Sequence, residues 1–385
     1  MYLKFVFAIL MFFMILVSFL RILFSKKYLK KIVPYKEKRI NEEKYTIIQP
    51  ILSGDPRLGS DLSENLKNLK KMRFVWLIDK NDEEAKKIAV EIIENEDYKY
   101  RIEIIEIEEV PQEINPKVFK IDKAIRKIKT EYVIILDDDS VIDIKGINEL
   151  SLYENIKGEW LATGIPYNYG EGGFWSKLVS AFVNSNSIIT YFTMSYLEKS
   201  KTINGMFYIA RTELFKKYNV FQEIKYWLCD DFAIAQYMIN KGVVLVQTGI
   251  FCNTRTTVTS FKQYILLMKR WMLFTKIYIK NAITLKFFVF ILVPSVLPAI
   301  LLIISFVKGG NYIFLTLAIL SLKAFMLYKL RFSILGKKEE KMVIVREIIN
   351  DFIVFFIFIY TVITPPVIKW RNKKIKVIDG KIRYE

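Results

Sequence analysis

Between residues 45 and 136 the sequence alternates short runs rich in β-branched residues with charged stretches of helical periodicity. This alternation predicts an α/β fold with a doubly wound, mainly parallel sheet. We expect strands at Tyr45–Gln49, Phe74–Ile78, Ile102–Ile107 and Tyr132–Leu136. We expect helices at Leu62–Met72, Asp82–Glu94 and Val118–Ile128. Such sheets bind ligands beyond the carboxyl ends of their strands.

Three consecutive carboxylates follow the last of these strands, in the sequence YVIILDDDSV that begins at Tyr132. Like charges this close raise one another's pKa unless a cation joins them. Asp137 and Asp139 form an Asp-x-Asp pair, and Mg²⁺ or Mn²⁺ commonly binds through one or two carboxylates together with substrate phosphates. A solvated acidic turn explains the three aspartates equally well when they are considered alone.

Three further motifs contain candidate site residues. Asp79 ends a strand at the same sheet edge, although strand-end aspartates are usually turn or N-cap residues. Asp230 and Asp231 open an amphipathic helix, where carboxylates are favourable without any function. The chain has no histidine, so a carboxylate is the natural candidate for a general base. Arg270 and Trp271 combine a phosphate-pairing cation with a stacking surface, and they also suit an interfacial helix.

Hydrophobic residues make up 52% of the chain, and the apolar excess collects at the N-terminus and after Leu285. The stretches long enough to cross a bilayer are Tyr2–Phe24, Leu285–Val307, Tyr312–Tyr328 and Ile348–Ile368. Lys323, inside the third stretch, is expected to snorkel or to face protein. Phe174–Leu197 and Phe261–Ala282 are more polar and are expected to lie at the interface.

The formal net charge is +18, from 58 Lys and Arg against 40 Asp and Glu. A nucleic-acid partner and the composition of an AT-rich genome are two explanations. We prefer an anionic membrane surface, without nucleic acid, because many basic residues flank the apolar runs. Cys229 and Cys252 lie in unlike contexts, which suggests neither a zinc site nor a disulfide framework and fits a reducing cytoplasm.

The order of these motifs, set between an apolar anchor and further apolar helices, resembles that of the inverting glycosyltransferase superfamily that includes cellulose and hyaluronan synthases. Within it the likeness is strongest to ceramide glucosyltransferase and its bacterial relatives. Other segments similar to that family are QPILSGDPRLGSDLSENL, EINPKVFKIDKAI, TGIPYNYGEGGFWSKL, INGMFYIARTEL and IKWRNKKIKVIDGKIRYE. The resemblance therefore covers about Tyr45 to the C-terminus.

The resemblance implies a GT-A fold that uses a UDP-sugar and a divalent metal, Mg²⁺ or Mn²⁺, and transfers the sugar to the hydroxyl of a membrane lipid. It implies that Asp79 contacts the uridine and that Lys117 lies near the diphosphate. Asp137 and Asp139 would hold the nucleotide and its metal. Glucose or galactose is the favoured sugar, while ceramide, diacylglycerol and a polycyclic or polyprenyl lipid all remain open as acceptors.

The resemblance also implies the catalytic roles. Asp231 would be the general base, with Asp230 where the family often has Glu. Arg270 and Trp271 would close over the pyrophosphate and the acceptor. Leu267 stands where the family's five-residue motif begins with Gln or Arg, which argues against processive polysaccharide synthesis. Such a synthase and a non-catalytic basic membrane scaffold are the alternative functions.

The expected organisation is that of a multi-pass protein of the cytoplasmic (inner) cell membrane. It has an N-terminal transmembrane anchor (1–25), a cytoplasmic GT-A catalytic domain (40–260), an amphipathic interfacial helix with the Arg-Trp motif (261–284), C-terminal membrane helices (285–368) and a basic tail (369–385). Lysines that follow the first apolar stretch favour an uncleaved anchor over a cleaved signal peptide, with the catalytic domain in the cytoplasm.

The basic tail conflicts with a simple count of spans. Three full spans after the catalytic domain would place the tail outside, whereas its lysines favour the cytoplasm. One apolar stretch is therefore expected to enter and leave the membrane on the same side. We favour Ile348–Ile368, which contains Asp351 and ends near Pro365-Pro366, over Leu285–Val307 with Pro294 and Pro298. The tail is then expected to pack near the catalytic domain.

Overall fold

The computed structural model describes residues 2–32, 39–94, 98–154, 156–336, 339–370, 373–378 and 380–384. The chain forms two compact units, and each unit is assembled from three separate segments. The helical unit comprises Met1–Lys31, Tyr167–Lys199 and Arg255–Pro366. The sheet unit comprises Ile32–Pro166, Ser200–Thr254 and Val367–Glu385.

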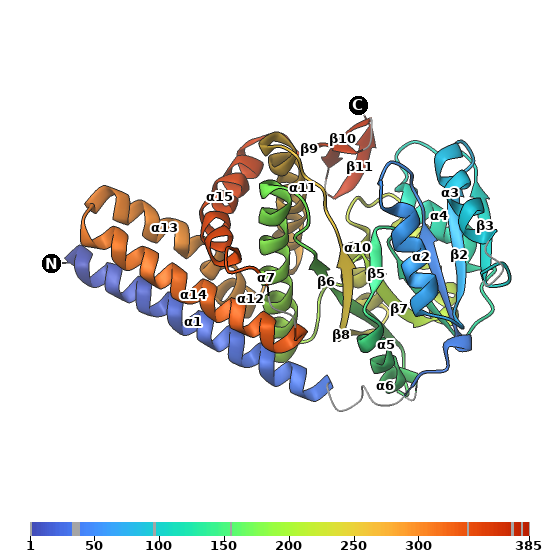
Figure 1. Cartoon of the computed structure of the whole chain (residues 1–385), viewed down its shortest axis with the longest axis horizontal. Helices are drawn as coiled ribbons and strands as arrows, with labels where there is room; N and C mark the ends of the chain where they lie inside the picture. The colour runs from blue at the N-terminus through green and yellow to red at the C-terminus, as the bar shows by residue number, and fades with distance from the viewer. Residues whose placement is uncertain are drawn as a thin grey trace. The chain divides into compact units, whose positions relative to one another are not determined.

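An eight-stranded sheet in the order β3-β2-β1-β4-β7-β6-β8-β5 is the framework of the sheet unit (Figure 1). The parallel strands are β1 (Tyr45–Pro50), β2 (Arg73–Asp79), β3 (Ile102–Ile107) and β4 (Tyr132–Leu136), which confirms the four predicted strands. Antiparallel pairing involves β5 (Ser140–Ile142), β6 (Trp160–Asn168), β7 (Phe207–Arg211) and β8 (Val244–Thr254).

The expected mixed α/β fold is confirmed, but the prediction of a mainly parallel sheet holds only for β1 to β4. Three residues separate β4 from β5. A parallel neighbour requires a crossover of a dozen residues or more. The short connection therefore excludes parallel pairing of β5 with β4, and β5 instead pairs antiparallel with β8, with Val141 opposite Asn253.

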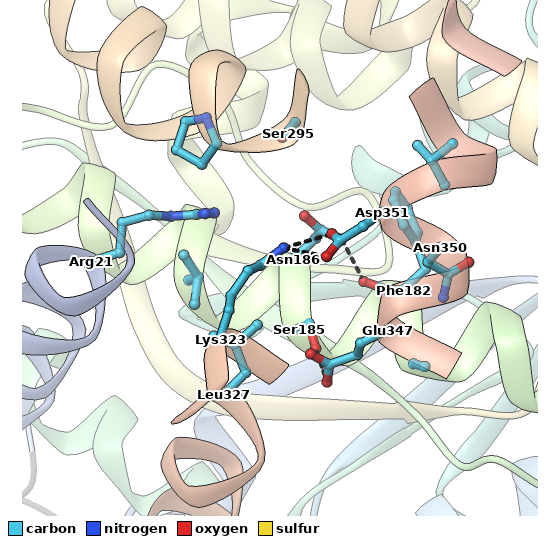
Figure 2. Close-up of a pocket in the computed structure, with 14 residues that line it drawn as sticks. Arg21, Phe182, Ser185, Asn186, Ser295, Lys323, Leu327, Glu347, Asn350 and Asp351 are labelled. Atoms are coloured by element: carbon cyan, nitrogen blue, oxygen red, sulfur yellow. Dashed lines mark hydrogen bonds and ion pairs between the residues drawn. The ribbon is translucent and has the colours of Figure 1, made fainter. Parts of the chain in front are cut away.

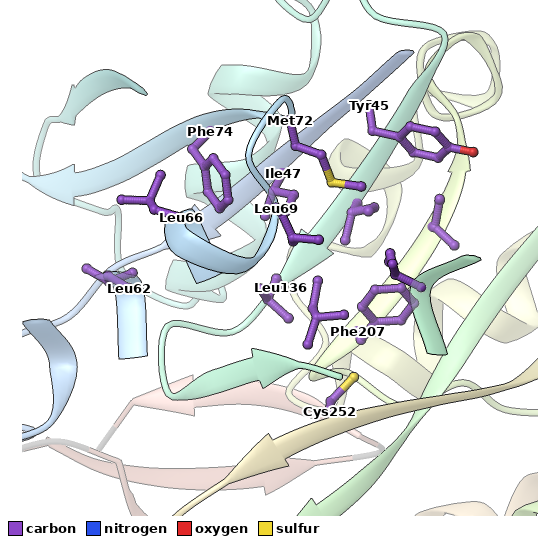
Figure 3. Packing of buried hydrophobic residues seen from close by; sticks show 14 of the residues in the cluster. Tyr45, Ile47, Leu62, Leu66, Leu69, Met72, Phe74, Leu136, Phe207 and Cys252 are labelled. Carbon is purple, nitrogen blue, oxygen red and sulfur yellow. The ribbon is translucent and has the colours of Figure 1, made fainter. Parts of the chain in front are cut away.

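Helices cover both faces of the sheet. They are α2 (Leu58–Asn68), α3 (Glu83–Ile93), α4 (Pro116–Ile125), α5 (Ile144–Ile147), α6 (Ser151–Glu154), α8 (Thr212–Tyr218), α9 (Val220–Ile224) and α10 (Asp230–Asn240), with the 3₁₀ turns η2 (Glu42–Lys44) and η3 (Asn148–Leu150). Ile47 of β1 belongs to the apolar cluster that includes α2, part of which Figure 3 shows, and its neighbour Ile48 belongs to the cluster that includes α4. Burial on both faces explains why the strands are apolar throughout.

Predicted helices agree with the structure except at α2 and at the end of α4, which stops at Ile125, three residues before the predicted Ile128. The larger difference is at α2. The helix begins four residues before the predicted Leu62 and ends at Asn68. Leu69 and Met72 are buried but lie beyond the helix, in the turn that leads to β2. Their apolar character, which serves the core and not the helix, is the reason that the prediction was wrong at this end.

The C-terminal tail forms a three-stranded antiparallel sheet of β9 (Val367–Trp370), β10 (Lys373–Ile378) and β11 (Lys381–Tyr384). Parts of the predicted tail, namely Arg371, Asn372, Asp379 and Glu385, lie outside the described residues. A bridge between Lys381 and Trp227 joins β11 to the loop before α10. The expectation that the tail packs near the predicted catalytic domain is therefore confirmed.

The helical unit contains α1 (Tyr2–Ile32), α7 (Phe174–Leu197), α11 (Phe261–Ala282), α12 (Leu285–Phe287), the π-helical turn η4 (Phe288–Leu292), α13 (Val293–Lys308), α14 (Asn311–Leu335) and α15 (Val343–Ile363). Among the described residues, three helical segments are long and apolar enough to cross a membrane: Lys4–Ile32, Leu285–Lys308 and Asn311–Leu335. α1, α13 and α14 pack on one another through buried residues such as Met14, Leu301 and Leu320.

The expected irregular backbone of Ile348–Ile368 is wrong, whereas the expectation that this stretch does not cross the membrane stays a prediction, since it is not among the candidate spans of the described residues. α15 runs unbroken to Ile363, and the predicted proline pair lies beyond its end. The irregular stretch is Leu285–Val307, where η4 precedes Pro294. Proline has no N–H to donate to the carbonyl four residues earlier, and a wider turn accommodates that loss. Lys323 Nζ lies 2.6 Å from both carboxylate oxygens of Asp351, so this lysine faces protein as expected.

Candidate active site

Asn115 fixes the start of α4 and the loop that precedes α10. Its side-chain oxygen accepts hydrogen bonds from the backbone N–H of Lys117 (3.0 Å) and Val118 (3.3 Å), which makes it the N-cap. Its Nδ2 donates to the carbonyl of Trp227 at 3.0 Å, and its backbone N–H donates to that of Lys225 at 2.7 Å. Asn115 therefore fixes the start of α4, which carries Lys117, relative to the loop that leads to Asp230.

Lys117 joins the end of β4 to the start of α10. Its Nζ lies 2.6 Å from Asp137 Oδ1 and 3.5 Å from Asp230 Oδ2, and it donates to the carbonyl of Gly205 at 2.8 Å. Burial would lower the pKa of Lys117, but the charges of Asp137 and Asp230 outweigh it and hold that pKa well above the usual value. Two predicted site residues, Asp137 and Asp230, thus meet at the ammonium group of a third, Lys117.

The other two carboxylates after β4 have different surroundings. Asp138 Oδ2 accepts a hydrogen bond from the backbone N–H of Leu52 at 2.7 Å, and Asp139 Oδ1 accepts one from Ser140 Oγ at 3.2 Å. Burial, and then the charges of Asp139 and Asp137, raise the pKa of Asp138 to about 8. Burial, and then the charge of Asp137, raise the pKa of Asp139 to about 7. Because these carboxylates hold protons near neutral pH, the cluster is one that an added cation would stabilise.

The donor set fits a divalent cation that shares its ligands with phosphate. The described residues contain no group of three or more Asp, Glu, Cys or His side chains placed to hold a metal ion. Asp137 and Asp139 would supply two ligands, which suffices for Mg²⁺ or Mn²⁺ when donor phosphates and waters complete the shell. The charge of Asp55, in the loop after β1, also acts on Asp139. Asp55 lies in the family-like segment QPILSGDPRLGSDLSENL but was not predicted as a site residue.

Asp79 lies at the end of β2, at the same edge as Asp137, and its Oδ2 is 3.0 Å from Lys120 Nζ. Lys120 is buried and also donates to the carbonyl of Ile51 at 2.8 Å. Sequence reasoning missed Lys120, although its i,i+3 spacing from Lys117 places both lysines on one face of α4. The contact between Asp79 and a uridine stays a prediction.

Asp231 occupies the first turn of α10. Its Oδ1 accepts hydrogen bonds from the backbone N–H of Phe232 at 2.7 Å and from Cys229 Sγ at 3.0 Å. A Cβ at Gly205 would lie 3.3 Å from Asp231 Oδ2, so glycine allows this close approach. Burial, and then the charge of Asp230, raise the pKa of Asp231 to about 6. A carboxylate with such a pKa is deprotonated at neutral pH and still basic enough to accept a proton.

Two buried polar atoms beside these carboxylates are poorly satisfied. Tyr208 Oη and Asp230 Oδ2 have no hydrogen-bond partner in the part of the chain that the structure describes, apart from the ion pair of Asp230 with Lys117. Native proteins rarely leave buried polar atoms in this condition, and a bound ligand is one ordinary explanation. Tyr208, on β7, was not predicted as a site residue.

Arg270 and Trp271 lie on α11, which belongs to the helical unit, whereas the carboxylates belong to the sheet unit. The Trp271 ring stacks on Phe182, with ring centroids 6.1 Å apart and an interplanar angle of 15°. The closure of Arg270 and Trp271 over a pyrophosphate stays a prediction.

The C-terminal strand supports the loop that leads to Asp231. The backbone N–H of Leu228 donates to the carbonyl of Gly380 at 3.0 Å, and that of Ile382 donates to the carbonyl of Tyr226 at 2.9 Å. Lys381 Nζ lies 5.9 Å from the centroid of the Trp227 ring. Asn115 and β11 therefore hold the same loop, and no sequence motif linked the tail to it.

Comparison with known families resolves the class of chemistry. The model of glycosyl transferase family 21 matches residues 8–383. The chain belongs to glycosyl transferase family 21. The resemblance to that family is confirmed, and the protein is a glycosyltransferase, which excludes the non-catalytic scaffold. Together with the sheet, the family assignment confirms the expected GT-A fold class. A comparison with curated protein sequences finds no match.

Similarity to solved structures is weaker. The mannosyltransferase PcManGT from Pyrobaculum calidifontis, in complex with GDP-Man and Mn²⁺, is 12% identical, with 89% of this chain and 98% of that one covered and a TM-score of 0.47. S. aureus TarS 1-349 in complex with UDP-GlcNAc is 14% identical, with 89% and 96% covered and a TM-score of 0.36. GalNAc-T7 with UDP, GalNAc and Mn²⁺ is 12% identical, with 58% and 47% covered and a TM-score of 0.40. At TM-scores below 0.5 these likenesses add nothing to the family assignment.

Proposed function

We propose that this family 21 enzyme is an inverting hexosyltransferase that moves glucose or galactose from a UDP-sugar to the hydroxyl of a membrane lipid such as ceramide or diacylglycerol. The observation that carries the proposal is the placement of Lys117 between Asp137 and Asp230, next to a carboxylate, Asp231, whose pKa is about 6. In this arrangement the ammonium group of Lys117 can contact a diphosphate, and Asp231 lies close enough to serve as the base. The apolar helices of the same chain support a lipid acceptor.

The chemistry follows from these residues. Asp137 and Asp139 would hold the divalent metal, which when bound acts as a Lewis acid on the leaving diphosphate. Lys117 adds a fixed positive charge where UDP departs. Asp231 takes the proton of the acceptor hydroxyl while the oxygen attacks the anomeric carbon from the face opposite UDP, so the configuration inverts. The Phe232 N–H and the Cys229 thiol hold the Asp231 carboxylate in one orientation for this transfer.

We expect UDP binding to depend on a divalent metal. The purified protein should bind UDP in the presence of Mg²⁺ or Mn²⁺, and EDTA should weaken binding by about tenfold or more because Asp139 loses its cation. Calorimetric titration with and without EDTA measures this. Asp139→Ala should bind weakly in both conditions, whereas Glu84→Gln, which changes an exposed carboxylate of α3, should behave as wild type. An affinity unaffected by EDTA and by Asp139→Ala would remove the metal from the proposal.

The sugar and the lipid are identified by a panel of UDP-sugars incubated with the enzyme and total membrane lipid, followed by mass spectrometry of the products. A single hexose added to a lipid is the expected product. A ladder of long chains would instead support the alternative, a processive polysaccharide synthase, which Leu267 in the place of Gln or Arg disfavours.

We infer that the sheet unit and the tail both lie in the cytoplasm. β11 pairs with the loop Tyr226–Leu228, so the tail is on the same side of the membrane as the rest of the sheet unit. The chain leaves that unit after Thr254 and returns at Val367, and the two candidate spans between these points form an even number. α15 then need not cross the membrane, and the lysines that follow α1 favour the cytoplasmic side.

Labelling with a membrane-impermeant thiol reagent tests this topology. Lys381→Cys, in a background with Cys229 and Cys252 replaced by Ser, should be protected in intact spheroplasts and labelled after lysis. Lys381 is exposed on β11, so the fold itself does not shield the new thiol. Labelling of intact spheroplasts would place the tail outside.

A further inference from the structure

A polar cavity lies inside the helical unit. It is lined by α1, α7, α13, α14 and α15 and has a volume of about 60 Å³ (Figure 2). One water needs about 10–15 Å³, so the cavity admits a group of a few heavy atoms and excludes an acyl chain or a nucleotide. Its charged and amide lining consists of Arg21, Asn186, Lys323, Glu347, Asn350 and Asp351.

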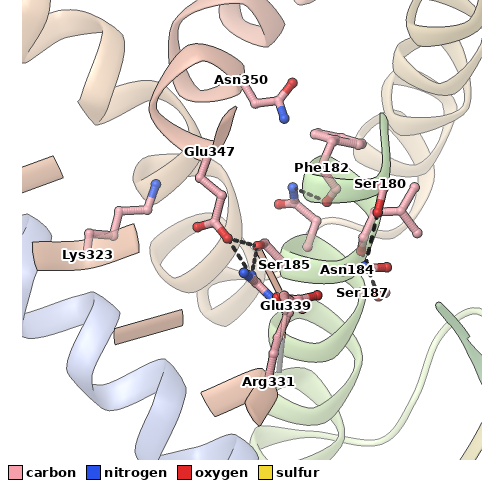
Figure 4. Close-up of polar contacts among 12 residues, drawn as sticks. Ser180, Phe182, Asn184, Ser185, Ser187, Lys323, Arg331, Glu339, Glu347 and Asn350 are labelled. Carbon is pink, nitrogen blue, oxygen red and sulfur yellow. Dashed lines mark hydrogen bonds and ion pairs between the residues drawn. The ribbon is translucent and has the colours of Figure 1, made fainter. Parts of the chain in front are cut away.

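Both carboxylates of the cavity already have a cationic partner. Asp351 is bound by Lys323, at 2.6 Å to each oxygen. Glu347 Oε1 accepts hydrogen bonds from Ser185 Oγ at 2.7 Å and from the guanidinium of Arg331, as Figure 4 shows. Each acidic group thus has a cationic partner, although Arg331 is shared with Glu339 at 2.7 Å and Glu347 Oε2 has no hydrogen-bond partner among the described residues.

Arg21 is different. Its side chain is only 6% exposed and points toward the cavity in Figure 2. Its Nε has no hydrogen-bond partner among the described residues. Asp351 attracts the guanidinium electrostatically but is held by Lys323. A buried guanidinium without a hydrogen-bonded anion is costly, and phosphate is an anion that its planar fork can bind with two hydrogen bonds.

The position of Arg21 along α1 indicates the source of such an anion. Arg21 precedes Lys26, the first of four lysines near the end of α1, by five residues. At a rise of 1.5 Å per residue this is about 7.5 Å along the helix. Because lysines that follow an apolar span lie at the level of the lipid head groups, the cavity lies within reach of that level.

We propose that this cavity binds the phosphate of an anionic membrane phospholipid, with Arg21 as the cation that receives it. The site is separate from the carboxylates of the sheet unit, and the proposal does not depend on which sugar or acceptor the enzyme uses. Bound lipid phosphate would join α1 to the helices that carry Lys323 and Asp351.

Thermal unfolding of the full chain in mixed micelles tests the proposal, in the absence of UDP. Phosphatidylglycerol should raise the Tm of the wild type by about 3–6 °C relative to phosphatidylcholine, as expected for a ligand present well above its Kd. Arg21→Gln should lose this increment because the cation is gone. Lys30→Gln removes an exposed cation of the same helix, and this variant should retain the increase in Tm. Soluble glycerol phosphate should have no effect.

Native mass spectrometry provides a second measurement that does not require variants of equal stability. The wild type should retain one phosphatidylglycerol molecule at collision energies that strip phosphatidylcholine. Arg21→Lys keeps the positive charge but loses the planar guanidinium that can donate two hydrogen bonds to phosphate. This variant should retain the lipid less well than the wild type. The proposal is overturned if Arg21→Gln keeps the full increment, if Lys30→Gln loses it equally, or if the wild type retains no lipid. Stabilisation by glycerol phosphate alone would overturn the lipid as the source.

Discussion

Replacing Asp231 with Asn should lower the rate of sugar transfer by about 10²–10⁴-fold and leave UDP binding unchanged. The amide is nearly isosteric and can still accept the hydrogen bond from the Phe232 N–H, which is 2.7 Å long in the structure. It cannot take a proton from an acceptor hydroxyl. Initial rates with the identified UDP-sugar and lipid measure the first effect, and calorimetry with UDP measures the second.

The pH dependence separates a lost base from a disturbed site. Since burial and the charge of Asp230 raise the pKa of Asp231 to about 6, the wild-type kcat/KM should fall as the pH drops through 6, where the base becomes protonated. Asp231→Asn should lack this inflection. Glu223→Gln, a change at an exposed position of α9, should keep both the rate and the profile. An Asp231→Asn enzyme that retained most of its activity would exclude Asp231 as the base.

Replacing Lys117 with Met should destabilise the protein by about 3–5 kcal/mol, because breaking a buried ion pair leaves its partner charge uncompensated. The partners are Asp137 at 2.6 Å and Asp230 at 3.5 Å. The affinity for UDP should fall as well, since a fixed positive charge beside the diphosphate is lost. Denaturant unfolding and calorimetric titration measure the two effects.

Added Mg²⁺ or Mn²⁺ should stabilise Lys117→Met more than the wild type, because a cation bound by Asp137 would replace part of the missing charge. Lys123→Met, an exposed substitution on the same helix, serves as the control and should change neither stability nor UDP affinity. A Lys117→Met protein with wild-type stability and UDP affinity would show that the ammonium group has no role between the carboxylates.

The edge of the sheet with Asp79 and Asp137 was predictable because its signals are local. A buried strand followed at once by carboxylates identifies both the strand and the edge at which it ends. Contacts between distant segments leave no such signal. Lys120 pairs with Asp79 and Ile51, and β11 supports the loop before α10. Only the fold brings these side chains and backbone groups together.

The irregular backbone expected of Ile348–Ile368 failed for a similar reason. Asp351 and the proline pair shorten the apolar length of this stretch, but α14 supplies Lys323, whose ammonium group neutralises Asp351. A charge that is costly in an isolated helix is acceptable in α15 because its partner comes from another helix. The sequence contained both residues, and only their separation along the chain concealed the pair.

The strand that supports the Asp231 loop is made long after the loop itself. Gly380 and Lys381 leave the ribosome about 150 residues after Cys229, which at about 5–20 residues per second is a delay of roughly 8–30 s. All of α11 to α15 is synthesised during that interval. A nascent chain can therefore form β1 to β4 early, whereas the loop before Asp231 gains its contacts with β11 only later. The sheet unit becomes complete only after the apolar helices have been translated, so the loop that leads to Asp231 gains the support of β11 only after them.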